Sequence, residues 1–279
     1  MSSPLPIDAT WRMCVRATFS IAFFSLTAGI VLCQTPQDRI RLNQIGFYPA
    51  GPKLAIVVDA GEGPFYVTTP DQVDTLYTGQ LSSERTWFAA SAPVRGADFS
   101  TFRAPGEYVV VVPSLGSSHT FRIDSDVHGD VSRASMKAFY YQRASMALEE
   151  AFACKWKRNE GHPDTAVYVH PSAATSLRPR GTLISAPRGW YDAGDYNKYV
   201  VNSGITVGTL LSLYEDFPAH LDTLDLNIPE TGNGLPDILD EILWNVRWML
   251  TMQDPDDGGV YHKLTTPYFE PFVMPENAT

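Results

Sequence analysis

The sequence predicts a multidomain protein in which an all-β domain precedes an all-α domain. Between residues 38 and 125, short runs rich in β-branched and aromatic residues are separated by Gly and Pro, which is typical of a β-sandwich. Beyond residue 131 the apolar residues change to helical spacing, most clearly over residues 235–249. We therefore expect a sandwich at residues 38–127 and a helical domain at residues 130–279.

Residues 1–33 predict an export signal. Arg12 and Arg16 precede an apolar run at 17–33 that is short for a membrane-spanning helix. Cleavage after Cys33 is the preferred interpretation, and a lipid anchor on Cys33 or a retained anchor helix are the alternatives. We therefore expect a bacterial protein that is secreted or periplasmic, or alternatively lipid-anchored at the outer surface.

Six runs of the first domain are expected to form strands, and they cover residues 53–59, 63–69, 74–79, 98–104, 106–113 and 119–124. Three helices are expected in the second domain, over residues 132–156, 196–217 and 235–252. The third has the strongest signals, because a glycine precedes it and a proline lies in its first turn. Its acidic start, at Asp237, Asp240 and Glu241, is interpreted as structural, since it favours the helix dipole. The loop at 158–188 is long enough to carry function.

Charge and cysteine content limit the possible partners. With 21 Lys plus Arg against 31 Asp plus Glu, the net charge is −10, which argues against a nucleic acid and suits a neutral substrate. The sequence holds 3 cysteines, and only Cys154 remains after signal removal, so no internal disulfide is expected. We expect a monomer.

The stretch with the strongest chemical signal is "GWYDAGDYNKYV", residues 189–200. Asp192 and Asp195 are separated only by Ala-Gly, and such small residues allow a turn in which two carboxylates converge on one water. Two such carboxylates can orient the water and accept its proton, as the general base of an inverting glycoside hydrolase does. One alternative is that either aspartate caps the helix expected at 196–217. A calcium loop is a weaker alternative, because no distal Glu follows.

Three stretches together resemble glycoside hydrolase family 9, whose members are mostly endo-β-1,4-glucanases. The first stretch, GWYDAGDYNKYV, resembles the catalytic-base motif of this family. A second, "IRLNQIGFYPAGPKLAIVV" at residues 40–58, is similar to the immunoglobulin-like module that precedes many of these catalytic domains. The third, at residues 228–266, begins "IPETGNGLPDILDEILWNV" and resembles their next long helix and loop.

The resemblance implies an immunoglobulin-like β-sandwich followed by an (α/α)6-barrel catalytic domain, and hydrolysis with inversion. Asp195 matches the general base, and Asp192 matches the aspartate that holds the same water. The implied substrate is a polysaccharide or oligosaccharide, with β-1,4-glucosidic bonds in cellulose or related β-glucans as the bonds cleaved. The family's general acid is a Glu far downstream. We therefore expect this sequence to be an N-terminal fragment that holds only part of the barrel and lacks the acid.

Metal sites are not expected in this part of the family's domain. Some relatives hold a structural zinc through Cys and His, but Ala144 stands where a cysteine would be expected. Cys154, His162 and His170 are candidate ligands without a fourth partner, so no metal or cofactor is predicted here. The family's best-known calcium ligands lie beyond this sequence.

Four residues beside the motifs are candidates for binding sugar, namely Trp190, Tyr196, Tyr261 and His262. Aromatic rings stack on the C–H faces of sugars, and an imidazole can hydrogen-bond hydroxyl groups. Two other functions stay open. One is an exo-acting β-glycosidase that trims short or amino-sugar oligosaccharides, and the other is a non-catalytic fragment associated with carbohydrate.

Overall fold

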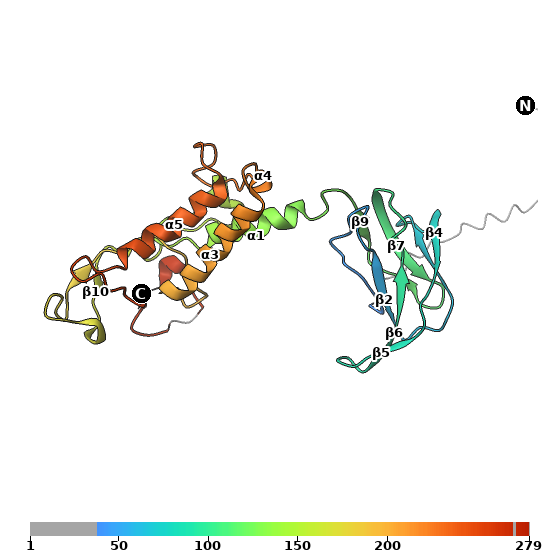
Figure 1. Ribbon diagram of the computed structural model, residues 1–279, viewed down its shortest axis with the longest axis horizontal. Helices are drawn as coiled ribbons and strands as arrows, with labels where there is room; N and C mark the ends of the chain where they lie inside the picture. The colour runs from blue at the N-terminus through green and yellow to red at the C-terminus, as the bar shows by residue number, and fades with distance from the viewer. Residues whose placement is uncertain (1–37, 270–271, 279) are drawn as a thin grey trace, which may run out of the picture.

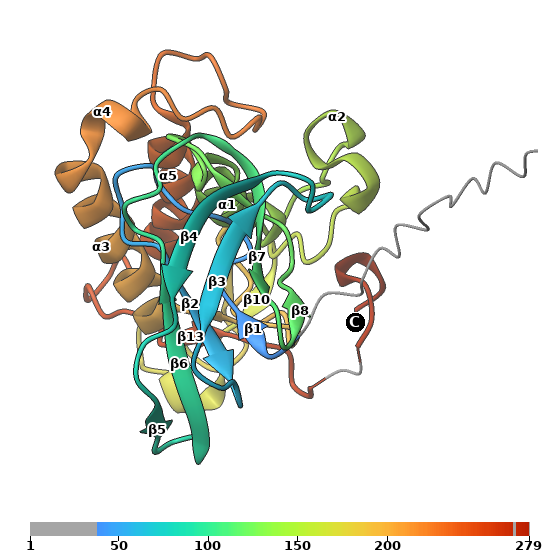
Figure 2. The same ribbon diagram turned by 90° about the vertical axis from the view of Figure 1, so that its right-hand side faces the viewer.

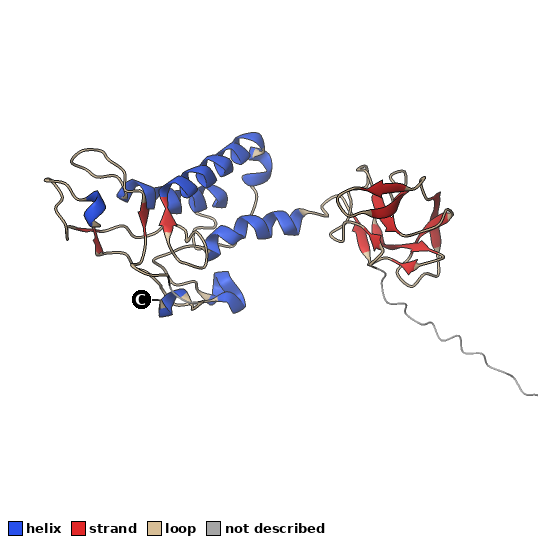
Figure 3. Cartoon of the chain, turned by 90° about the horizontal axis from the view of Figure 1, so that it is seen from below, coloured by secondary structure: helices blue, strands red, loops and turns tan. Residues whose placement is uncertain are grey.

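The computed structural model describes residues 38–269 and 272–278, and the expected export signal lies outside them. Figure 1 shows a β-rich body and a helical body joined by the short segment that leads into helix α1 (Gly129–Tyr141). Figure 3 shows the same division, with the long helices at one end and the sandwich strands at the other. Among the described residues, no helix is long and apolar enough to cross a membrane.

The N-terminal body is a sandwich of two antiparallel sheets, which faces the viewer in Figure 2. One sheet has the order β1 (Ile40–Arg41), β2 (Leu54–Val58), β6 (Ala92–Asp98) and β5 (Arg85–Trp87). The other has the order β4 (Thr75–Gln80), β3 (Pro64–Thr68), β7 (Gly106–Val112) and β8 (Gly116–Ser117), and β9 (Phe121–Ile123) also pairs with β7.

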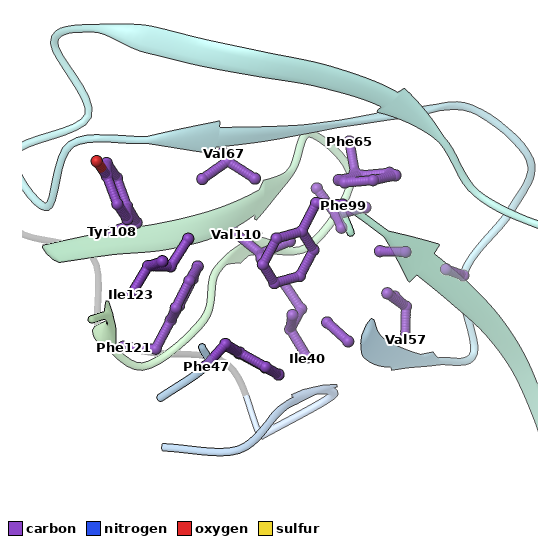
Figure 4. Packing of buried hydrophobic residues seen from close by; sticks show 14 residues of the cluster. Ile40, Phe47, Val57, Phe65, Val67, Phe99, Tyr108, Val110, Phe121 and Ile123 are labelled. Carbon is purple, nitrogen blue, oxygen red and sulfur yellow. The ribbon is translucent and has the colours of Figure 1, made fainter. Parts of the chain in front are cut away.

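The sandwich core is aromatic. Phe47, Phe99 and Phe121 meet with ring centroids 5.3–5.5 Å apart, and Phe65 and Val67 point inward from alternate positions of β3. Figure 4 shows these side chains filling the space between the sheets. Burial of each such side chain contributes roughly 1.5–3 kcal/mol. The sandwich therefore closes around its own core.

One expected strand is wrong. Residues 98–104 form a turn after β6, and Phe99 enters the core from that turn. The strand lies earlier, at 92–98, where Pro93 and Gly96 weaken the β signal. The pairing of β6 with β2, residue by residue from Leu54↔Asp98 to Val58↔Val94, outweighs that poor local propensity.

The helical body contains three long helices, α1, α3 (Val200–Asp216) and α5 (Asp237–Thr251). Its short elements are α2 (Glu150–Ala153), η1 (Cys154–Trp156), η2 (Pro171–Ala173), α4 (Pro218–Leu221), η3 (Pro275–Asn277) and two strand pairs. These pairs are β10 (Val167–Tyr168) with β11 (Leu183–Ile184), and β12 (Lys198–Tyr199) with β13 (Lys263–Leu264). Helix α3 packs on α5, and a shared apolar core includes Ile238, Ile242 and Leu210.

The helix expected at 132–156 is too long. Helix α1 ends at Tyr141, and the chain then runs extended, with Arg143 forming a β-bridge with Trp190 and Leu148 with Arg158. No Gly or Pro marks this end. The bridge to residue 190 ends the helix through a contact between distant parts of the sequence, which helical periodicity does not report.

Candidate active site

The motif at 189–200 forms a loop whose ends are held together. The Asp192 N–H donates to the Asn197 carbonyl oxygen at 2.9 Å, and the Tyr196 N–H lies 3.4 Å from the Ala193 oxygen. Tyr196 adopts a left-handed backbone with φ +55, which turns the chain sharply after Asp195. The loop then enters β12 and α3. Both aspartates therefore project from one short loop that a backbone hydrogen bond closes.

Neutral side chains hold both carboxylates. Asp195 is half-buried, and its Oδ2 accepts from the Asn197 Nδ2 at 2.9 Å, with the Tyr199 hydroxyl 3.5 Å away. Asp192 is exposed and accepts from the Asn202 Nδ2 at 2.7 Å. An ionised carboxylate has about four acceptor positions, so these contacts leave capacity for a water. That the two carboxylates share one water stays a prediction.

The helix-capping interpretation of the two aspartates is wrong. Helix α3 begins at Val200, and its N-cap residue, Tyr199, makes no side-chain capping hydrogen bond. Asp192 contacts the side chain of Asn202, which belongs to the first turn of α3, instead of a backbone N–H. Stabilisation of a helix end therefore does not explain why two carboxylates occupy this loop.

Helix α5 holds the stem of the loop. The Asn245 Oδ1 accepts from the Trp190 backbone N–H at 3.1 Å, and the Glu241 Oε1 accepts from the Trp190 indole at 2.8 Å. The Trp244 indole donates to the Gly189 carbonyl oxygen at 3.2 Å. Gly189 has φ +85, and a Cβ there would lie 2.8 Å from the Trp248 ring. The stem thus lies too close to α5 for any larger residue.

A buried ion pair connects this helix to the end of α1. The Arg143 guanidinium lies 2.9 Å from the Glu241 Oε2 and 3.1 Å from Glu230, and neither Arg143 nor Glu241 is exposed. Burial raises the pKa of Glu241, although Arg143 and the Trp190 indole oppose this shift. Glu241, expected to serve only the helix dipole, therefore joins α1, α5 and the loop stem.

A second buried charge holds the other side of the loop. The Lys198 ammonium lies 2.7 Å from the Asp164 carboxylate and donates to the carbonyl oxygens of Ala186 and Arg188 at 3.1 and 2.6 Å. Burial lowers the pKa of Lys198, while Asp164 opposes the shift. Lys198 therefore links the loop at 158–188 to the strand that follows the two aspartates.

Two of the predicted sugar-binding residues contact the helical core. Trp190 is buried, packs on Phe139 at 4.9 Å between ring centroids and donates to Glu241, so its interpretation as a stacking surface is wrong. The Tyr261 hydroxyl lies 3.0 Å from Asp254, on a part of the core that holds Trp248. The positions of both side chains depend on packing against α5, which the spacing of the motif does not reveal.

Tyr196 and His262 lie near the aspartates. The Tyr196 ring is half-buried against Tyr191 at 4.9 Å, and its hydroxyl donates to the Val273 carbonyl oxygen. His262 is exposed, and the β12–β13 pairing brings its ring to 6.4 Å from Tyr199. Their binding of sugar stays a prediction.

An aromatic hollow lies beside the aspartate loop. Its volume is about 460 Å³, and its lining includes Trp156, Tyr191, Tyr196 and the loop residues Ala193 and Gly194. Trp156 is 63 % exposed, whereas Tyr191 is buried. The hollow thus combines one exposed aromatic ring with the backbone between the two aspartates, a lining that can receive the C–H face of a sugar.

The candidate zinc ligands lie in separate surroundings. Cys154 is exposed, the His162 Nδ1 lies 2.9 Å from the Tyr191 hydroxyl, and the His170 Nδ1 lies 2.8 Å from Ser172. Within residues 38–269 and 272–278, no group of three or more His, Cys, Asp or Glu side chains is placed to hold a metal ion. These three residues therefore do not fit the family's structural zinc, which needs four converging ligands.

Comparison with known proteins shows which family the chain belongs to. The profile of glycosyl hydrolase family 9 matches residues 128–277, and that of the cellulase N-terminal ig-like domain matches residues 35–117. The chain therefore belongs to glycosyl hydrolase family 9, as its motifs predicted. An immunoglobulin-like domain with β-sheets precedes the family 9 domain, which confirms the order of the two domains.

Individual relatives are similar along most of the chain. A xyloglucan-specific endo-beta-1,4-glucanase of Bacteroides ovatus is 44 % identical over 263 residues, covering 91 % of this chain and 44 % of the relative. Endoglucanase D of Acetivibrio thermocellus is 37 % identical over 244 residues, covering 86 % and 37 %. A solved family 9 structure from Bacteroides ovatus matches with TM-score 0.82 at 44 % identity, covering 88 % of this chain and 44 % of that one. The chain thus spans less than half the length of these relatives.

The residues that hold the carboxylates were missed. Asn197 and Tyr199 are spaced two apart, as residues on one face of an extended segment are, whereas Asp195 precedes the sharp turn at Tyr196. Strand β12 begins within this run, at Lys198. A period-2 reading of this segment would have found Asn197 and Tyr199, whereas the helix expected from residue 196 separates them.

Proposed function

We propose that this chain is the N-terminal part of an inverting glycoside hydrolase that cleaves β-1,4-glucosidic bonds in cellulose or a related β-glucan. The observation that carries the proposal is the pair of carboxylates on one closed loop, each bound by a neutral donor. A cation in contact with Asp195 would stabilise its charged form and weaken it as a base. Family membership supports the reaction class, and the relatives named endoglucanases support the substrate class.

In the proposed mechanism Asp195 is the general base. A water held between Asp192 and Asp195 attacks the anomeric carbon on the face opposite the leaving group, and Asp195 takes its proton. Asp192 accepts the other hydrogen of the water and orients it. A general acid from outside this sequence protonates the leaving oxygen. The β-linked substrate therefore gives an α-configured product.

The helical domain is proposed to be part of an (α/α)6 barrel. Helix α3 exposes Val201 and Ile205, which lie one turn apart, on the side opposite its buried residues Val207 and Leu210. We infer that a further element covers these two apolar side chains in the complete enzyme. Relatives more than twice the length of this chain supply room for further helices, which would cover this side of α3.

The proposed substrate determines the proposed location of the enzyme. A polymeric glucan cannot enter a cell, so the enzyme acts outside it, in agreement with the export signal expected at residues 1–33. The net charge of −10 does not hinder a neutral glucan. In this proposal the enzyme works as a monomer, and this part of the chain binds no cofactor.

The experiment compares this chain with the complete enzyme on two substrates. Cellohexaose needs a protonated leaving group, whereas 2,4-dinitrophenyl β-cellobioside releases a phenolate that leaves without a proton. We expect the chain alone to fall far behind the complete enzyme on cellohexaose, because general acid catalysis contributes about 10²–10⁴-fold. The deficit shrinks on the dinitrophenyl substrate, since only the base is then needed.

Substitution of the base tests its role directly. In the complete enzyme, Asp195→Ala lowers kcat on cellohexaose by about 10²–10⁴-fold and leaves KM nearly unchanged. Asp216→Ala, at an exposed carboxylate at the end of α3, is the matched control and keeps full activity. Proton NMR of the first product should show the α-anomer. A β-anomer appearing first would mean retention and would remove the proposed roles of both aspartates.

A further inference from the structure

The amide of Asn197 lies buried beneath the aspartate loop with both of its ends engaged. The residue is 1 % exposed. Its Nδ2 donates to the Asp195 Oδ2 at 2.9 Å, and its Oδ1 accepts from the Thr265 hydroxyl at 2.7 Å. The Asn197 backbone N–H also lies 3.4 Å from the Asp195 Oδ1. One residue therefore contacts both oxygens of the proposed base.

Chemistry fixes the direction of this amide. An ionised carboxylate only accepts hydrogen bonds, so the NH2 end of Asn197 must face Asp195. The oxygen end then faces Thr265, whose hydroxyl can donate. Strand β12 pairs with β13 through Lys198↔Leu264, and the next step of this register places Asn197 beside Thr265. A segment that follows the third long helix thus braces the loop that precedes the second.

The Tyr199 hydroxyl completes the arrangement. It lies 3.2 Å from the Asn197 Nδ2 and 3.5 Å from the Asp195 Oδ2. Among the described residues, these two groups are the side-chain donors to the Asp195 carboxylate, and the Asn197 backbone N–H adds a longer contact. The rotamer of Asp195 therefore depends mainly on the Asn197 amide, which makes the shortest of these contacts.

We propose that Asn197, braced by Thr265, is a positioning residue that sets the direction of the Asp195 carboxylate toward the attacking water. The inference rests on the proposed role of Asp195 as general base. Without the amide, the carboxylate rotates between rotamers and spends only part of its time aimed at the water. Misplacement of a catalytic group by about 1 Å can cost about 100-fold in rate.

Side-chain substitution separates positioning from loop structure. The loop is closed by the Asn197 backbone oxygen, which accepts from the Asp192 N–H and survives any side-chain change. Asn197→Ala removes only the amide. Thr265→Val keeps the shape of the threonine but removes the hydroxyl that braces the amide, and Thr265→Ser restores it.

The first experiment follows the contact itself in this chain by NMR with 15N-labelled asparagine. The Asn197 side-chain protons should exchange slowly with solvent and shift on Asp195→Ala, because their acceptor is lost. Asp192→Ala should leave them in place. Rapid exchange in the unaltered chain, or equal response to both substitutions, would overturn the proposal without reference to activity.

The second experiment measures kinetics in the complete enzyme, normalised to the folded fraction by circular dichroism. We expect Asn197→Ala to lower kcat by about 10- to 100-fold with KM changed less than about twofold. Thr265→Val gives a smaller loss in kcat, which Thr265→Ser recovers. A purely structural role would instead lower the folded fraction and leave the normalised kcat unchanged, which would overturn the proposal.

The two proposals fail in different ways. If Asp195→Ala retains activity, the proposed function is wrong. If Asp195→Ala is inactive while Asn197→Ala keeps the kcat of the unaltered enzyme, the base is correct and only the positioning role is wrong.

Discussion

The two domains satisfy their buried charges differently. The sandwich surrounds an apolar cluster that includes Phe65 and Phe121, and its buried cations, Lys53 and Arg95, donate to backbone carbonyl oxygens. The helical domain instead buries a complete ion pair, Arg143 with Glu241, near the stem of the aspartate loop. Burial of a charge is costly unless it is paired and hydrogen-bonded, so this domain spends part of its stability on the placement of a loop.

The two domains also differ in how their main elements cover one another. In the sandwich each sheet covers the inner face of the other, and the apolar cluster lies between them. Helix α3, by contrast, packs on α5 on one side and exposes Val201 and Ile205 on the other. The sandwich thus packs two sheets around one apolar core, whereas the helical domain uses part of its interior to hold the loop that carries Asp192 and Asp195.

The largest expected effect is the loss of stability of the helical domain when Glu241 is removed. Glu241→Ala leaves the Arg143 guanidinium with only the partly exposed Glu230 and removes the acceptor of the Trp190 indole. Loss of one partner of a buried ion pair costs about 3–5 kcal/mol. Calorimetry should show the helical transition at lower temperature and the sandwich transition unchanged. Glu107→Ala, on an exposed position of β7, is the control, and a loss below about 1 kcal/mol for Glu241→Ala would contradict the assigned role.

A buried and an exposed isoleucine of the helical domain should differ in the stability lost on truncation. Ile242 is 3 % exposed on α5, and Ile205 is 68 % exposed on α3. In this chain Ile242→Ala should cost about 2–5 kcal/mol and Ile205→Ala within about 0.5 kcal/mol, as measured by urea unfolding. In the complete enzyme Ile205→Ala should become costly, since further barrel helices would bury it. An equally small cost there would argue against barrel closure over α3.

The smallest effects come from one buried tyrosine in each domain. Burial raises the pKa of Tyr140 to about 12, and its buried hydroxyl has no hydrogen-bond partner among the described residues. The unfolded chain loses this proton near pH 10, whereas the folded chain keeps it to about pH 12. The contribution of Tyr140 to stability is thus fully present below pH 10 and is lost as the pH rises toward 12.

Tyr140→Phe removes a buried hydroxyl that has no partner among the described residues, so it should stabilise the helical domain by about 1 kcal/mol at pH 7. At pH 11 the gain should be larger, because the unaltered chain has by then lost stability through ionisation of this tyrosine in the unfolded state. Tyr108→Phe in the sandwich removes a hydrogen bond from the Tyr108 hydroxyl to the Pro105 carbonyl oxygen, so it should destabilise by about 1 kcal/mol. Thermal unfolding at both pH values measures the two effects. The same sign for both substitutions at pH 7 would show that the domains do not differ in this respect.

Local patterns in the sequence predicted the order of the domains, the long helix α5 and the stretch that carries Asp192 and Asp195. These features depend on residue types at short spacing, such as apolar periodicity and two carboxylates around Ala-Gly, which the sequence by itself determines. The resemblance to family 9 likewise rested on contiguous strings.

The contacts that support the loop of Asp192 and Asp195 become visible only in the tertiary structure. Trp190 became a buried link to Glu241 instead of a sugar platform, α1 ended at Tyr141 because Arg143 pairs with residue 190, and Asn197 met Thr265 across a strand pair. These contacts join residues that lie 51, 47 and 68 positions apart, where no local spacing relates the partners. Burial then selects the hydrogen-bond partners, since an unpaired polar group in the core costs more than any local propensity contributes.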